Sequence, residues 1–133
     1  MAVTPITITD IAMGTPLALP AYTSVATVAD GATIDLAGVN PADVLVNVKF
    51  SASGGSSAGA VYIAAGDNPP AFRSGLGNIS YATSGSVADR EVLFAIGDSA
   101  RIMQSTGKIE LAFDQTSSGS VQSASIRAFR LPR

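Results

Sequence analysis

Residues 92–113 decide the fold, and they read VLFAIGDSARIMQSTGKIELAF. Apolar side chains occupy every second position at both ends of this stretch: Val92, Phe94 and Ile96, then Ile109, Leu111 and Phe113. Because side chains alternate between the two faces of a strand, the spacing predicts two strands with one apolar face each. A polar corner over residues 97–105 and a turn at Thr106-Gly107 separate them. Each apolar face needs a second layer to cover it, which predicts packed β-sheets.

The rest of the chain supplies further strands at spacings of about ten residues. Candidate strands, bounded by Gly, Pro, Ser and Asn, cover residues 4–9, 23–27, 33–36, 44–50, 60–64, 79–81 and 121–131. No segment shows the 3.6-residue period of a helix. We therefore expect an all-β, single-domain β-sandwich of about eight strands, jelly-roll-like or Greek-key, with no helix longer than a turn or two.

The alternating pattern also predicts the core and some of the strand pairs. Strand 60–64 is expected to pair with strand 44–50, and residues 25–36 are expected to form a weak strand pair that turns at Asp30-Gly31. The predicted core residues are Val46, Val48, Phe50, Val61, Ile63, Phe94, Ile96, Ile109, Leu111, Phe113 and Ile126.

Residues 1–21 form an extended N-terminal arm or edge segment, and residues 22–133 form the sandwich domain. Pro5, Pro16 and Pro20 favour an extended backbone in the first segment. Two interpretations stay open: an arm that binds a neighbouring subunit, and a segment wrapped on its own domain. The residues predicted to bind a partner are Pro5, Ile6, Ile8, Pro16, Pro20, Phe72 and Arg73.

Two loops are expected to differ in mobility. Ser51 to Gly59 contains only Ser, Gly and Ala, so it cannot bury apolar area and should be mobile. Ala65 to Gly77 should be ordered, because two prolines restrict it and Phe72 can anchor it. Asp98 and Arg101, at the corner of the deciding stretch, are interpreted as an ion pair that braces the corner, with a contact to a partner chain as the alternative.

Charge is sparse and unevenly distributed. Charged residues make up 14% of the chain and the net charge is −2. The first 48 residues contain four acidic residues and no Lys or Arg, whereas residues 101–133 contain five basic and two acidic residues. So few charges suit either a surface covered by partners or a surface rich in Ser, Thr and Gly. The asymmetry suits pairing of subunits, unless folding mixes the two ends.

The composition argues against an enzyme, a cofactor and a metal site. His and Cys are both absent, which removes the commonest general base and the commonest metal ligands. Glu91 and Glu110 alternate away from the apolar faces of their strands, so they are interpreted as exposed. A pI of about 4.8 argues against nucleic-acid binding. The start of the chain lacks the basic region of a signal peptide, and no apolar run suits a membrane span, so we expect synthesis in a cytoplasm.

Three segments resemble small structural proteins of tailed bacteriophages: Ala65-Gly66-Asp67-Asn68-Pro69-Pro70-Ala71-Phe72-Arg73-Ser74-Gly75-Leu76-Gly77, residues 98–105 and residues 126–132. The resemblance is to head decoration (auxiliary or cement) proteins, and it covers roughly the second half of the chain. It implies a β domain that forms a homo-oligomer, with a trimer as the leading expectation. It also implies binding to the major capsid protein, at the outer surface of a virion assembled in the host cytoplasm.

A carbohydrate-binding module or a tail-fibre receptor-binding domain is the main alternative. Such domains stack exposed aromatic rings on sugars, and this chain has no Trp. The aromatic residues able to serve are Tyr22, Tyr62, Tyr81, Phe72 and Phe129. A lone soluble enzyme is a third, weaker alternative.

Overall fold

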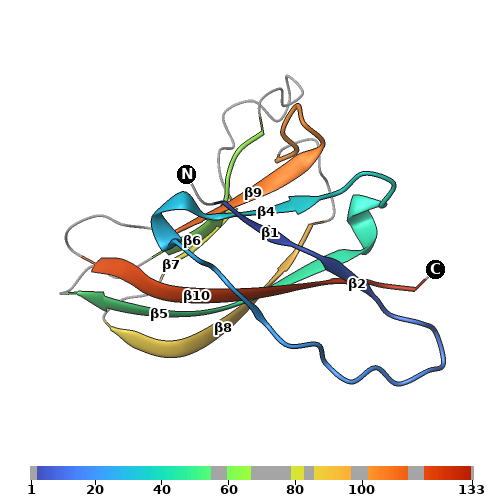
Figure 1. The fold of residues 1–133 in the computed structure, drawn as a ribbon, viewed down its shortest axis with the longest axis horizontal. Coiled ribbons are helices and arrows are strands. Elements are labelled where there is room, and N and C mark those ends of the chain that lie inside the picture. Colours follow the sequence, from blue (N-terminus) through green and yellow to red (C-terminus); the bar gives the residue numbers. More distant parts are fainter. Residues whose placement is uncertain are drawn as a thin grey trace.

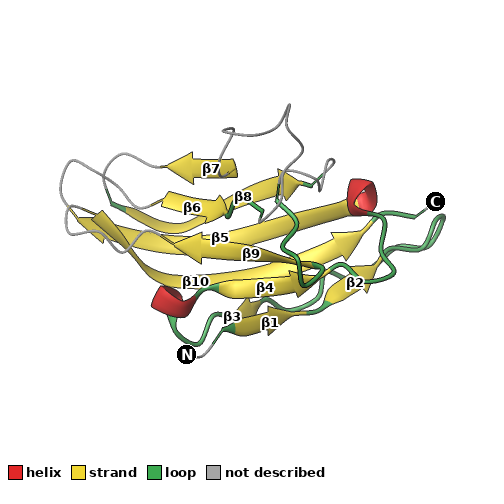
Figure 2. Ribbon diagram, turned by 90° about the horizontal axis from the view of Figure 1, so that it is seen from above, coloured by secondary structure: helices red, strands yellow, loops and turns green. Residues whose placement is uncertain are grey.

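The computed structural model of the chain describes residues 3–54, 60–66, 79–82, 86–96, 102–113 and 119–132. In these residues two β-sheets lie against each other (Figures 1 and 2). Their helical elements are two single 3-10 turns, η1 (Val28–Asp30) and η2 (Pro41–Asp43). The predicted all-β sandwich is therefore confirmed.

The described residues form ten strands in two sheets. Sheet A contains, in spatial order, β1 (Thr4–Ile6), β4 (Ala32–Asp35), β9 (Lys108–Phe113), β6 (Ala60–Ile63) and β7 (Ile79–Ala82). Sheet B contains, in spatial order, β2 (Ile8–Asp10), β10 (Gly119–Arg130), β5 (Val44–Gly54) and β8 (Val87–Ala95), and β3 (Thr23–Ser24) also pairs with β10.

Strands β3 to β10 correspond to the eight predicted strands from residue 23 onward. They form the orders β4-β9-β6-β7 and β3-β10-β5-β8, in which β6 and β7 are the consecutive strands that pair with each other. Every other connection between consecutive strands of this set crosses from one sheet to the other. This is the arrangement of a double-sheet jelly roll. Strands β1 and β2 are short additions at the N-terminus, one on each sheet.

All eleven predicted core residues are buried between the sheets. Phe94 comes from sheet B, with Ile96 directly after its strand, and Ile109, Leu111 and Phe113 come from sheet A, so the two halves of the deciding stretch cover each other. The corner between them is less polar than expected, because Ile102 is fully buried. Gln104 is also buried, and its Nε2 donates to the carbonyl oxygen of Ala65 over 3.0 Å.

The expected strand pair over residues 25–36 is wrong. Strand β3 pairs with β10 in sheet B, whereas β4 pairs with β1 and β9 in sheet A. The chain changes sheets between them through η1 and Gly31, whose φ is 73°. Val25 and Ile34 are both buried in the same core cluster. Alternation alone does not distinguish a hairpin from a crossing between sheets, because both put apolar residues on the core side.

The pairing of strand 60–64 with strand 44–50 is also wrong, because β6 pairs with β7 and β9 while β5 pairs with β8 and β10. Part of the predicted mobile loop belongs to a strand instead. Ser51 to Gly54 continue β5 and pair with β10. Residues 55–59 lie outside the described residues. So do residues 67–78, which carry Phe72 and Arg73, and residues 97–101, which carry the Asp98 and Arg101 pair.

The segment from Thr4 to Asp10 lies along one side of the sandwich as edge strands. Strand β1 pairs with β4 and β2 pairs with β10, both in parallel. Ile6 is 5% exposed and belongs to the core cluster, and Ile8 is half-buried against it. The structure thus shows Thr4 to Asp10 packed on their own domain.

Strands β7 and β8 end the two sheets on the other side of the sandwich. Arg90 of β8 stands opposite Phe50, and its Nη1 donates to the Tyr81 hydroxyl of β7 over 2.8 Å. The Phe50 and Tyr81 rings meet edge to face, with 6.4 Å between their centroids. A charged residue on the inner side of an edge strand discourages pairing with another sheet edge.

Candidate interaction surface

The loop from Ile11 to Tyr22 joins β2 to β3 and extends away from both sheets (Figure 1). Gly14, with a φ of 74°, turns it, while Pro16 and Pro20 lack the amide needed to pair with a strand. Its exposed large apolar side chains are Met13 (74% exposed), Leu17 (40%) and Leu19 (66%). We call Ile11–Tyr22 the projecting loop.

Two contacts to Arg130 of β10 hold the chain where the projecting loop leaves sheet B. The Ile11 amide donates to the carbonyl oxygen of Arg130 over 2.9 Å, which extends the β2–β10 pairing by one residue. The guanidinium of Arg130 forms an ion pair with Asp10 at 2.7 Å. Both side chains are exposed, so this pair contributes little to stability, typically below about 1 kcal/mol.

The other end of the loop is held by a cluster on the outer face of sheet B. Its members are Tyr22, Asn47, Lys49, Glu91 and Arg127, and we call it the Arg127 cluster. Arg127 Nη1 donates to the carbonyl oxygen of Pro20 over 3.2 Å, and Nε donates to Asn47 Oδ1 over 2.9 Å. Arg127 Nη2 lies 3.9 Å from a carboxylate oxygen of Glu91. The cluster therefore joins the loop to β5, β8 and β10.

Tyr22 is the loop's own contribution to this cluster. The Arg127 guanidinium carbon lies 4.1 Å from the centre of its ring, and Lys49 Nζ lies 4.6 Å from it, both in the range of cation–π contacts. Its hydroxyl donates to the Glu91 carboxylate, and the hydroxyl oxygen also lies 2.8 Å from Asn47 Oδ1. Burial raises the pKa of the Tyr22 phenol above its usual 10.0, and the hydrogen bond to Glu91 adds to this, while Arg127 opposes it.

The sequence-predicted partner residues fall into three groups in the structure. Pro16 and Pro20 lie in the projecting loop. Pro5, Ile6 and Ile8 lie in the edge strands of the chain's own sheets, and the Ile6 side chain is buried in the core. Phe72 and Arg73 lie outside the described residues. Met13, Leu17 and Leu19 were missed, although their signal was present as large apolar residues between glycine and prolines.

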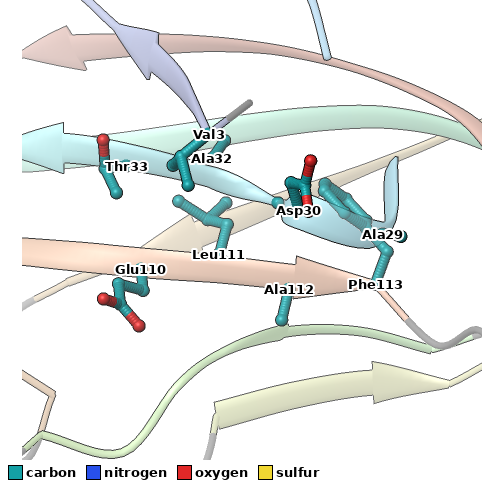
Figure 3. A pocket seen from close by; sticks show the side chains of 10 residues that line it. Val3, Ala29, Asp30, Ala32, Thr33, Glu110, Leu111, Ala112 and Phe113 are labelled. Atoms are coloured by element: carbon teal, nitrogen blue, oxygen red, sulfur yellow. The ribbon is translucent and has the colours of Figure 1, made fainter. Parts of the chain in front are cut away.

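A hollow of about 250 Å³ lies where β4 and β9 meet η1 (Figure 3). A Cβ added to Gly31 would lie 2.4 Å from the carbonyl oxygen of Leu111, so the backbones approach closely here. The carboxylates of Asp30 and Glu110 stand apart rather than converging (Figure 3). Across the described ranges, no three residues of His, Cys, Asp or Glu are grouped as metal ligands.

Glu91 and Glu110 are exposed, as the sequence predicts. Glu91 lies on sheet B and Glu110 on sheet A, and each alternates with residues that face the core. They therefore point out of opposite faces of a sandwich whose sheets are about 10 Å apart. This separates them beyond the reach at which two carboxylates flank one glycosidic bond.

Comparisons of the chain with protein-family models, with curated proteins and with solved structures found no match. In the part of the chain that the structure describes, no helix is long and apolar enough to cross a membrane.

Proposed function

We propose that this chain is a structural protein of a bacteriophage virion that binds the outer surface of the capsid and stabilises it, and that the projecting loop makes the contact. The resemblance of three segments to head decoration proteins supports the virion location. The observation that carries the proposal is the exposure of Met13, Leu17 and Leu19 in one projecting, uncharged loop.

Apolar side chains gathered on one loop favour a binding role over a connecting role. Fully burying a Leu or Met side chain contributes about 1.5–3 kcal/mol, so covering the exposed fractions of these three contributes roughly 3–5 kcal/mol. No charged residue occurs from Ile11 to Ala29, so a partner can cover the loop without burying an unpaired charge. Such a gain per copy becomes large when many copies bind one lattice.

The loop also meets the requirement that little conformational freedom be lost on binding. Pro16 and Pro20 restrict its backbone, and contacts to Arg130 and Arg127 hold its two ends. A surface that is already ordered loses less conformational entropy when a partner binds. Binding that favours the assembled shell stabilises it by mass action.

The jelly roll is compatible with this proposal without establishing it. Viral capsid proteins and lectins both use this architecture, and a fold alone does not specify a function. We retain the homo-oligomer, with a trimer as the leading stoichiometry, as part of the proposal. Sedimentation of the purified chain measures it directly, and a monomer at micromolar concentration would contradict it.

Carbohydrate binding remains the alternative proposal, because Tyr22 stands among polar side chains on a sheet face. The geometry favours it less, since Arg127 and Lys49 already lie over the Tyr22 ring and its hydroxyl is bonded within the chain. Stacking on a sugar would have to displace one of these cations. Micromolar or tighter binding on a glycan array, abolished by Tyr22→Ala, would favour this alternative.

Electron microscopy of virions that carry the chain tests the proposal, with density on the outside of the shell as the expected result. A Leu19→Ser variant should bind the shell at least about tenfold more weakly, because its side chain loses most of its apolar area. Leu93→Ser is the matched control, since Leu93 is 62% exposed but lies on β8. Equal binding by both variants would overturn the role of the loop. Density on a tail fibre, or nowhere on the particle, would overturn the capsid location.

A further inference from the structure

The geometry points to Arg127 as the positioning residue that holds the projecting loop in its binding conformation; this rests on the proposed function. The Arg127 side chain is 16% exposed although it lies on the outer face of sheet B. Its nitrogens contact the loop through Pro20, β5 through Asn47 and β8 through Glu91. A planar guanidinium offers such donors in a fixed geometry, which a lysine ammonium does not.

Arg127 acts on the end of the loop that the sheet holds least. Strand β3, which follows Tyr22, has two residues and pairs with β10 at Ser125 and Ile126. Just before this short strand, Arg127 donates to the Pro20 carbonyl oxygen and lies over the Tyr22 ring. Without these contacts, the loop would be tied at this end mainly by the short β3 ladder and the adjacent Val25 amide, which donates to Ala124.

The same side chain is not needed to hold the sandwich together. Strand β5 pairs with β10 from Gly54 to Val44 and with β8 over most of its length. The core lies on the opposite face of sheet B from the Arg127 cluster, since Val46, Val48 and Ile126 alternate with Asn47 and Arg127. Loss of the guanidinium should therefore free the loop and leave the sheets paired.

Tyr22 completes the arrangement from the loop side. Its ring lies under Arg127 and Lys49, and its hydroxyl reaches Asn47 and Glu91. Replacing Tyr22 by Phe keeps the cation–π contacts and removes the hydroxyl, whereas replacing Arg127 by Lys keeps a charge and removes the fork. Tyr22→Phe therefore isolates the hydrogen bonds of the hydroxyl, and Arg127→Lys isolates those of the guanidinium.

Limited proteolysis with chymotrypsin, read by mass spectrometry, tests the inference on the purified full chain. Cleavage after Met13, Leu17 or Tyr22 should be about tenfold to a hundredfold faster in Arg127→Ala, because bonds to a charged group are lost. Arg127→Lys should also be cleaved faster than the wild type. Tyr22→Phe should be cleaved at a rate between those of the wild type and Arg127→Lys. Arg90→Ala is the control, since Arg90 is another arginine of sheet B and donates to the Tyr81 hydroxyl, away from the loop.

The distribution of cleavage sites decides the role. Cleavage confined to the loop, with an unchanged urea midpoint, supports positioning by Arg127. Unchanged cleavage of the loop, or cleavage that spreads along β5 and β10 with a lowered midpoint, overturns it. This measurement needs no partner. If Arg127→Ala frees the loop yet still binds the shell as tightly as the wild type, the positioning contact stands and the docking role of the loop fails.

Discussion

Ile6 decides whether the N-terminal segment belongs to the sandwich or serves as an arm for a neighbour. In the structure its side chain is 5% exposed in the core cluster, and β1 pairs with β4 with Ile6 opposite Ile34. The Thr4 hydroxyl oxygen accepts a bond from the Ala26 amide over 3.0 Å, which ties the same segment down. Truncation of Ile6 should therefore destabilise the domain itself.

The expected size of this effect follows from burial. Removing the outer carbons of Ile6 loses about 0.8 kcal/mol for each buried carbon group and adds a cavity term, so Ile6→Ala should lower the free energy of unfolding by about 3 kcal/mol. Ile8 is half-buried on β2, and Ile8→Ala should lower the same free energy by about 1 kcal/mol. These two isoleucines stand two residues apart, so the second is a matched control.

Urea unfolding followed by circular dichroism measures both values. With an m-value of about 1.5 kcal/mol/M, the midpoint should fall by about 2 M for Ile6→Ala and by about 0.7 M for Ile8→Ala. If both variants unfold at the wild-type midpoint, the segment does not pack on its own domain and the arm interpretation is correct. If both variants also lose self-association without losing stability, the segment binds a second copy.

Two further predictions concern Tyr22 and a close approach of two backbones. Because the pKa of Tyr22 is raised, the folded state keeps a proton that the unfolded state loses above about pH 10. The free energy of unfolding should therefore decline as pH rises above this value, and it should decline less steeply in Tyr22→Phe. Identical urea midpoints of the wild type and Tyr22→Phe from about pH 8 to pH 11 would contradict this. Gly31→Ala should lower the melting temperature strongly, because the added Cβ would lie 2.4 Å from the Leu111 carbonyl oxygen at a φ of 73°. Gly38→Ala, with a φ of 72° and open space around it, should lower the free energy of unfolding by about 1–2 kcal/mol. Equal losses of stability in the two variants would contradict the close approach of the Gly31 and Leu111 backbones.

The sequence alone was sufficient to identify most of the strands from residue 23 onward and the side of each that is buried. The pattern of β5 shows this, with Val46, Val48 and Phe50 on one face and Asn47 and Lys49 on the other. The alternation of side chains is a local property of an extended backbone, so it can be read without knowing the partner strands.

The sequence did not predict correctly which strands pair. Strand β6 looked like the partner of β5 because it follows it in the chain, yet it lies in the other sheet. Which strands pair depends on the whole set of connections, and a jelly roll places most consecutive strands on opposite sheets. Ile6 and Ile8 fail in the same way, because their spacing predicts one face of one strand, whereas the chain changes sheets between them.

For the candidate surface too, some features follow from the sequence and others depend on the tertiary structure. The sequence by itself determined that residues 11–22 are apolar, uncharged and interrupted by prolines, because these properties belong to each residue and its neighbours in the chain. The alternation that puts Ile126 in the core also puts Arg127 on the opposite face of the same strand. Only the tertiary structure decided that Arg127 meets Asn47, Glu91 and the returning loop, because that meeting requires β8, β5 and β10 to be adjacent and in register. Adjacency between segments far apart in the chain is set by the packing of two whole sheets, and no local pattern records it.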